Sequence, residues 1–157
     1  MSIVVVDSGG ANIASVLHAL RRQGVDPVFS ADADTIRGAG RVILPGVGAA
    51  GQAMDVLRTH GLVDVIRSLV QPVLGICLGM QLLFTSSAED QADLLGIIPA
   101  RLDRLGQSEG LRVPHMGWNT VSWLREHPIT EGIPSGSYFY FVHSFYPAPS
   151  DPDVALG

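Results

Sequence analysis

Short apolar runs recur along the first half of the chain, at the lengths that buried strands have. They are rich in β-branched residues and are bounded by glycine, proline or polar turns. Such runs are typical of strands whose two faces are both covered by other elements. The predicted strands are residues 3–6, 25–30, 41–44 and 72–76.

Between these runs, apolar residues recur at helical spacing. Asn12 can cap a helix that runs to about Gln23, with one apolar face, and Gly24 ends it. Two more helical faces lie either side of Gly61, and a short helix is expected over residues 80–84. This alternation predicts an α/β fold with three layers: a mostly parallel sheet with helices on both faces.

The pattern changes after Leu94 to short extended runs separated by glycines and prolines. The runs near Val113 and over residues 119–123 and 138–142 predict an antiparallel or peripheral extension of the sheet. No repeat and no long linker divides the chain, so residues 1–157 are expected to form a single domain.

Composition narrows the classes of function. The chain has 46% hydrophobic and 16% charged residues, which favours a packed core over disorder. Its formal charge is −5 and its basic residues are scattered, so we expect no nucleic-acid partner. Every basic residue is arginine, which excludes a Schiff-base lysine and a phosphate-binding lysine of the Walker type.

A single cysteine excludes an internal disulfide and a multi-cysteine zinc site, and we expect no metal and no cofactor. The N-terminal residues lack the basic segment of a signal peptide. No run approaches the roughly 18 apolar residues that span a bilayer. We therefore expect a cytoplasmic protein without a membrane partner.

The clearest chemical motif is the run Gly-Ile-Cys-Leu-Gly at residues 75–79, between a predicted strand and a predicted helix. A nucleophile on a sharp strand-to-helix turn needs small neighbours two residues away, because the backbone doubles back there. Amides at the start of a helix also favour a thiolate. Cys77 is therefore a candidate nucleophile, although lone cysteines are more often buried apolar residues.

A second motif, Pro-Gly-Val-Gly at residues 45–48, lies at the carboxyl end of another predicted strand, where open α/β sheets bind ligands. Its backbone could aim an amide at the same point as the Leu78 N–H. Two such donors would hold the oxygen of a tetrahedral acyl intermediate. Alone, the motif is better explained as an ordinary glycine turn.

These segments resemble a known family. The run of residues 75–84 closely resembles the nucleophile segment of class I glutamine amidotransferases. Residues 7–12, 44–48, 114–119 and 138–144 narrow the resemblance to the glutaminase subunits of imidazole glycerol phosphate synthase, from Ile3 to about Pro147. It implies a flavodoxin-like amidotransferase domain of about 200 residues.

The resemblance also implies roles for individual residues. Cys77 would form a glutamyl thioester, and the backbone of Val47 or Gly48 and of Leu78 would form the oxyanion hole. The residues implied to bind glutamine are Gly46, Gln81, Glu89, His143, Ser144 and Phe145. The implied partner is a (βα)₈-barrel cyclase, forming a heterodimer and facing Asn12, Met116, Trp118 and Asn119.

The sequence departs from the family pattern at the general base. The family's His-Pro-Glu segment is absent, since no histidine here is followed two residues later by a carboxylate. His127-Pro128 is followed by Ile129 and comes too early. We therefore expect a C-terminal part to be missing, and this 157-residue form to be inactive or nearly so.

Two alternatives remain open. The chain could serve another amidotransferase, such as those of aminodeoxychorismate or pyridoxal phosphate synthesis, which share the cysteine turn. It could also be a non-catalytic binding module related to glutaminases, as the missing base suggests. A flavodoxin-like redox or nucleotide domain is disfavoured, because no Gly-x-Gly-x-x-Gly run follows the first strand.

Overall fold

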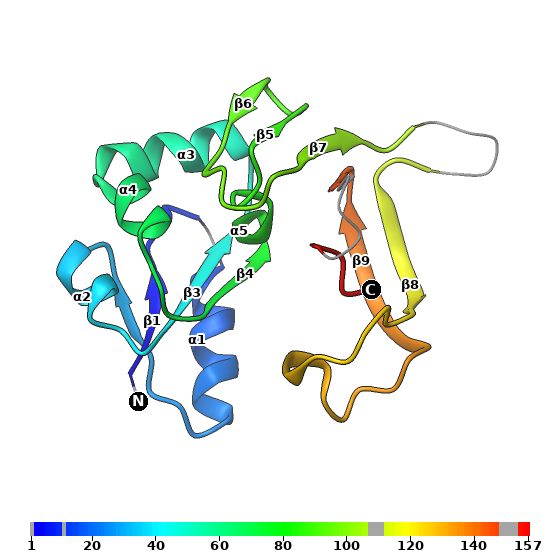
Figure 1. The fold of residues 1–157 in the computed structure, drawn as a ribbon, viewed down its shortest axis with the longest axis horizontal. Coiled ribbons are helices and arrows are strands. Elements are labelled where there is room, and N and C mark those ends of the chain that lie inside the picture. The colour runs from blue at the N-terminus through cyan, green and yellow to red at the C-terminus, as the bar shows by residue number, and fades with distance from the viewer. Residues whose placement is uncertain (1, 11, 107–111, 148–153) are drawn as a thin grey trace.

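The computed structural model describes residues 2–10, 12–106, 112–147 and 154–157. Its centre is a four-stranded parallel sheet with strand order β2-β1-β3-β4 (Figure 1). All four strands predicted from the sequence are confirmed, the first with the predicted bounds and the other three with shifted ends. Proline has no N–H for a strand ladder, so β2 begins only after Pro27. The strands are β1 (Ile3–Val6), β2 (Val28–Ser30), β3 (Arg41–Gly46) and β4 (Val73–Cys77).

Helices cover both faces of this sheet, which confirms the three-layer α/β prediction. One helix, α1, lies on one face, and α2, α3 and α4 lie on the other (Figure 1). Gly61, in a left-handed conformation, separates α3 from α4 as predicted. The helices are α1 (Ile13–Arg22), α2 (Ala33–Arg37), α3 (Ala50–Thr59), α4 (Leu62–Arg67) and α5 (Leu78–Gln81).

Two details of the predicted helices are wrong. Asn12 occupies the N-cap position of α1 but has φ 68°, and its side chain accepts from the Ser15 hydroxyl instead of a helix amide. The predicted helix over residues 80–84 is the single turn α5, and it begins earlier. Its continuation is prevented because the carbonyls of Leu82, Leu83 and Phe84 accept hydrogen bonds from residues 95–98.

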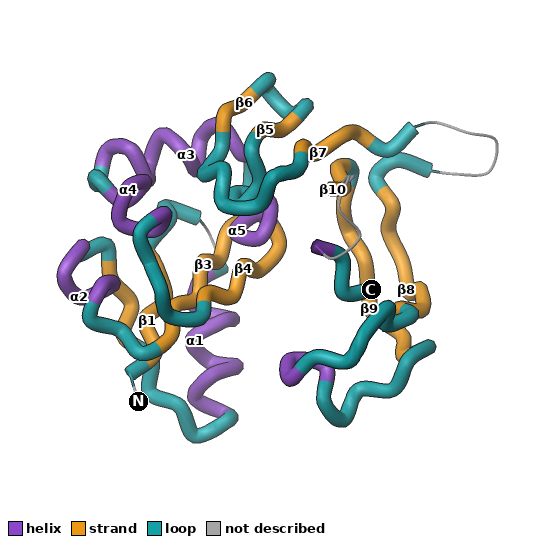
Figure 2. The backbone as a smooth tube through the Cα atoms, viewed as in Figure 1, coloured by secondary structure: helices purple, strands orange, loops and turns teal. Residues whose placement is uncertain are grey.

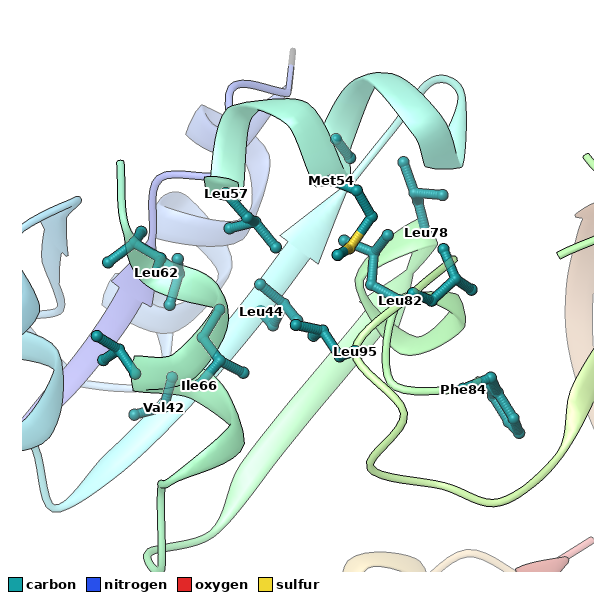
Figure 3. Close-up of a cluster of buried hydrophobic side chains, with 14 of the residues drawn as sticks. Val42, Leu44, Met54, Leu57, Leu62, Ile66, Leu78, Leu82, Phe84 and Leu95 are labelled. Atoms are coloured by element: carbon teal, nitrogen blue, oxygen red, sulfur yellow. The ribbon is translucent and has the colours of Figure 1, made fainter. Parts of the chain in front are cut away.

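The main core lies between the sheet and the helices α3 and α4. Leucine, isoleucine and methionine side chains from these helices pack on the apolar residues of β3, and α5 extends the cluster (Figure 3). In contrast, α1 has no fully buried residue, and its apolar face is only half-buried. The most buried large members include Leu44, Met54, Leu57, Leu62, Ile66, Leu82 and Leu95.

The second half of the chain forms two further sheets. The predicted antiparallel pairing is confirmed, but extension of the central sheet is not. Each of these outer strands pairs with a strand outside the central sheet, and the β8–β9 hairpin lies away from β1, β3 and β4 in Figure 2. One sheet has the order β10-β7-β5-β6, and the other is the hairpin β8-β9. The bounds are β5 (Ser86–Ser87), β6 (Ala92–Asp93), β7 (Arg101–Arg104), β8 (His115–Val121), β9 (Ser137–His143) and β10 (Phe145–Pro147).

A short 3₁₀ turn, Pro128–Thr130, lies in the connection between β8 and β9. Residues 154–157 contain no strand. Ala11, within the motif at residues 7–12, lies outside the described residues. Among the helices that the structure describes, none is long and apolar enough to cross a membrane.

Candidate active site

Cys77 is the last residue of β4 and the residue immediately before α5. It is a free, exposed cysteine, so its sulfur is open to a substrate. Its backbone has φ 53° and ψ −118°, which is a conformation that L residues rarely adopt. Such strain costs on the order of 1–3 kcal/mol and clusters at functional sites. The strand-to-helix turn predicted from the sequence is therefore present.

The glycines on either side of this turn are required by its close packing. A Cβ added at Gly75 would lie 2.7 Å from the Met80 nitrogen. A Cβ added at Gly79 would overlap the Leu44 carbonyl of β3. The first turn of α5 thus lies directly on β3. This explains why small residues stand two positions before and after Cys77.

The Pro-Gly-Val-Gly segment lies next to the nucleophile, as the sequence predicts. In the parallel pairing of β3 with β4, Gly46 is the direct partner of Cys77. A Cβ added at Gly46 would lie 3.0 Å from the Gly79 nitrogen, which is tighter than an ordinary contact, so a side chain there would press on the start of α5. Gly48 follows with φ 99°, and the Val47 side chain is exposed. Gly46 therefore lies beside the nucleophile and the start of α5, and Val47 and Gly48 follow it directly in the chain.

A residue that sequence reasoning missed holds this segment in place. Ser8 is buried, and its hydroxyl donates a 2.8 Å hydrogen bond to the Pro45 carbonyl. The pairing of β1 with β3 ends at Ile43, so the hydroxyl satisfies a carbonyl that the ladder leaves free. A Cβ added at Gly10 would lie 3.3 Å from the Val47 nitrogen. The turn after β1 thus packs against the Pro-Gly-Val-Gly segment.

The two residues implied to bind the amino-acid end of glutamine lie in α5 and in the β5–β6 turn. Gln81 ends α5 and is half-buried. Glu89 lies in the β5–β6 turn, and its Oε2 accepts a 3.0 Å hydrogen bond from the Ala50 N–H. Ala50 is the first residue of α3 and stands two positions after the Pro-Gly-Val-Gly segment. The structure therefore links Glu89 to that segment.

The other implied substrate residues lie at the junction of β9 and β10. His143 Nδ1 is 2.9 Å from the Phe145 carbonyl oxygen, and its ring lies 5.3 Å from that of His115. The Ser144 carbonyl accepts from the Leu105 N–H. Among the described residues, no hydrogen bond or ring contact joins His143, Ser144 or Phe145 to Cys77. The structure does not bring these residues into contact with the nucleophile.

No histidine in the described part of the chain is placed as a general base. His127 Nδ1 accepts from the Ile129 N–H, and His115 stacks on Phe141 with ring centroids 5.4 Å apart. None of the five histidines forms a hydrogen bond with Cys77 or an ion pair with a carboxylate within the described residues. In the same residues, no cluster of His, Cys, Asp and Glu could hold a metal ion.

The implied partner residues lie on two separate parts of the molecule. Met116 and Trp118 share one exposed face of the β8–β9 hairpin, where Trp118 meets Tyr140 edge-on with ring centroids 5.5 Å apart. Asn119 belongs to the opposite face, because strand side chains alternate. Asn12 precedes α1, and no hydrogen bond, ion pair or ring contact among the described residues joins it to the hairpin.

Comparisons with known proteins agree with this geometry. Residues 4–155 match the family model described as glutamine amidotransferase class-I. A solved structure of a glutamine amidotransferase shares the fold, with TM-score 0.67 and 20% identity, over 90% of this chain and 71% of that one.

Curated relatives are more similar in sequence. The imidazole glycerol phosphate synthase subunit HisH of Xanthomonas euvesicatoria pv. vesicatoria is 49% identical over 97% of this chain and 76% of its own length. The HisH subunit of Xylella fastidiosa strain Temecula1 is 48% identical over 91% of this chain and 72% of its own length. This chain therefore belongs to the class I glutamine amidotransferase family, within its HisH branch.

Proposed function

We propose that this chain is the glutaminase subunit of an imidazole glycerol phosphate synthase. It hydrolyses glutamine to glutamate and ammonia and passes the ammonia to a cyclase subunit in histidine biosynthesis. The observation that carries this proposal is the pairing of Gly46 with an exposed Cys77 at a strained strand-to-helix turn. The HisH relatives support the assignment to this subunit.

The proposed chemistry is a two-step acyl transfer. The Cys77 thiolate attacks the side-chain amide carbon of glutamine and forms a C–S bond, and the C–N bond then breaks. The departing nitrogen takes up a proton and leaves as ammonia. Water next attacks the glutamyl thioester, which releases glutamate and restores the thiol.

Both steps pass through an oxyanion, which backbone donors can stabilise. The Leu78 N–H begins α5 directly after the nucleophile, and the Val47 or Gly48 amide supplies the second donor from the neighbouring strand end. Loss of one such donor typically costs about 10²–10³ in rate. Gly46 has no side chain, which leaves room for the start of α5 beside this strand end.

In this proposal, glutamine is bound by its amino-acid end, which is the end remote from the amide that reacts. Gln81 and Glu89 bind its amino-acid end, because a carboxylate suits an ammonium group. His143, Ser144 and Phe145 complete the substrate site when the β9–β10 junction faces the nucleophile. The family resemblance supports these roles.

Proton transfer needs a group that the described residues do not place beside Cys77. Without a base, the thiol is weakly activated, and nothing protonates the departing nitrogen. We therefore propose that these 157 residues alone release ammonia from glutamine at a negligible rate. A full-length parent would carry out the complete reaction.

The test of the function uses the full-length protein in complex with its cyclase. A Cys77→Ala variant should lose glutamine-dependent product formation by at least about 10³-fold, because no thioester can form. Supplying ammonium salt in place of glutamine is the control, since it should restore cyclase product if the variant is folded and docked. Ammonia release from glutamine at the normal rate by Cys77→Ala would refute the assignment.

The lack of a placed base favours one alternative, a non-catalytic module that only docks on a synthase. Thiol labelling separates the two functions. A glutaminase should react at Cys77 with an electrophilic glutamine analogue, and excess glutamine should protect it. A docking module should label no faster than a small-molecule thiol and should show no protection.

A further inference from the structure

The helix that follows the Pro-Gly-Val-Gly segment has no cap of its own. Its N-cap residue, Ala49, has the extended backbone of a cap (φ −90°, ψ 142°) but no side chain that can accept a hydrogen bond. The first amides of a helix need acceptors from outside it. Glu89, 39 residues further along the chain, supplies one by accepting from the Ala50 N–H at 3.0 Å. A carboxylate is also the charge that a helix N-terminus favours.

The turn that carries Glu89 is itself anchored. Ser87 is buried, and its hydroxyl accepts from the Glu89 N–H at 3.0 Å. The Ala88 N–H donates to the Leu102 carbonyl of β7. At the far end of α3, the Arg58 guanidinium donates to the Asp93 carbonyl. The β5–β6 hairpin is thus fixed along α3, beside which it lies in Figure 1.

The backbone after Glu89 is strained in a way that needs such anchoring. Asp90 and Gln91 have φ 56° and φ 51°, two consecutive left-handed residues without a glycine. Asparagine and glycine are the usual residues of such a turn, and glutamine is not. Strained backbone persists only where its surroundings determine it. The contact with Ala50 is one of those constraints.

We propose that Glu89 is a positioning residue for the Pro-Gly-Val-Gly segment (the oxyanion segment, residues 45–48), and that it acts through the first turn of α3. This inference rests on the proposed glutaminase function. Oε2 holds Ala50, and through it the adjoining residues 46–49 that face Cys77. Within the described residues, Oε1 has no hydrogen-bond partner, so it remains available for the ammonium group of glutamine. One carboxylate then joins substrate recognition to the placement of the oxyanion donors.

Two substitutions separate these two tasks in the full-length protein with its cyclase. Glu89→Gln keeps an oxygen that can accept from Ala50 but loses the charge. Its KM for glutamine should rise about tenfold or more, while kcat should stay within about threefold. Glu89→Ala loses both, so its KM should rise similarly and its kcat should fall at least about tenfold below that of Glu89→Gln. Equal kcat values for the two variants would overturn the proposal.

Amide exchange provides a readout that does not depend on activity. The Ala50 amide should exchange at least about tenfold faster in Glu89→Ala than in the parent, and within about threefold of the parent rate in Glu89→Gln. An unchanged Ala50 exchange rate in Glu89→Ala would also overturn the proposal. If Glu89→Ala does not fold, Glu89→Asp takes its place, because its shorter side chain withdraws the carboxylate from Ala50.

The matched control is Asp90→Asn, which removes a neighbouring carboxylate that makes no hydrogen bond in the described structure. It should leave KM, kcat and Ala50 exchange unchanged, and a loss equal to that of Glu89→Ala would contradict a specific role for Glu89. The test also remains distinct from that of the proposed function. The proposed function fails if Cys77→Ala releases ammonia at the normal rate. The exchange rate of the Ala50 amide, in contrast, tests only the role of Glu89.

Discussion

At the scale of single residues, the active-site turn depends on glycines, which have no side chain. Gly46, Gly75 and Gly79 each stand where a Cβ would press on backbone of a neighbouring segment. The absence of side chains there lets the start of α5 lie against β3, which places the Gly79 nitrogen and the Leu78 side chain beside Gly46. The packing of three glycines thus determines where the thiol and its proposed oxyanion donors meet.

We expect Gly79→Ala to be the most damaging of the conservative changes at this turn. Its Cβ would overlap the Leu44 carbonyl, which belongs to a central strand and cannot move aside. We expect a loss of about 3 kcal/mol or more in the free energy of unfolding, measured by chemical denaturation. Gly106→Ala is the control, because a Cβ there meets nothing within 4 Å, and it should change stability by less than about 0.5 kcal/mol.

Of these glycines, Gly75 and Gly79 could be predicted from the sequence because they flank the nucleophile, whereas the close contact at Gly46 depends on the pairing of β3 with β4. The strand, the nucleophile and the helix follow each other directly in the chain. A glycine two residues before and two residues after Cys77 therefore indicates that the turn has no room for side chains there. Ser8 and Glu89 could not be predicted to hold the oxyanion segment. Their partners lie 37 and 39 residues away, and only the strand order brings them together.

At the scale of elements, the short helix α2 shows how a cap can stabilise a segment without an apolar pattern. Asp32 Oδ1 accepts from the Thr35 hydroxyl at 2.7 Å and from the Thr35 N–H at 2.8 Å. These hydrogen bonds hold the pKa of the Asp32 carboxyl below its usual value of 3.8, and the one from the Thr35 hydroxyl is the largest cause. The helix contributes one buried side chain, Ile36, to the core.

Replacing Thr35 with valine should therefore raise the pKa of Asp32 toward 3.8, measured by NMR titration of its carboxyl carbon. Because the folded pKa is depressed, the cap contributes stability above pH 3.8 and loses it as the pH falls through the lowered value. The stability difference between the parent and Thr35→Val should shrink over the same range. A pKa that does not move would show that the hydroxyl is not the main cause.

Helices and strands could be predicted where the hydrophobic period and the length of the run indicated the same element. Prediction failed where hydrogen bonds to distant residues determine where an element ends. The four parallel strands and the pair of helices around Gly61 carry clear patterns. The helix α2 has five residues, too few for a period, and its only signal is Asp32 three residues before Thr35. The short length of α5 depends on hydrogen bonds from residues 95–98, which no local pattern reveals.

At the scale of the whole molecule, the β8–β9 hairpin lies apart from the central sheet and presents an apolar face to solvent. Its side chains include Trp118 and Tyr138, which are 69% and 70% exposed. Met116, Tyr140 and Val142 lie on the same face by strand alternation. Exposed aromatic faces of this kind mark interaction sites. The proposed cyclase would bind here through Met116 and Trp118.

We expect Trp118→Ala to weaken binding of the full-length protein to its cyclase by about tenfold or more, since exposed aromatic anchors dominate interfaces. Titration calorimetry would measure the change in Kd. Leu124→Ala is the control: its side chain is similarly exposed but lies outside the two strands, and its Kd should match that of the parent. If Trp118→Ala binds as tightly as the control, the cyclase uses another surface.

The pairing of Gly46 with Cys77 also limits how this fold can change. Inserting one residue into β3 before Pro45 would bring the proline opposite the sulfur. The pyrrolidine ring has no N–H to offer and would press on the start of α5. Loops elsewhere in the chain can lengthen gradually over evolution, whereas β3 must keep its residue count for the enzyme to retain its chemistry.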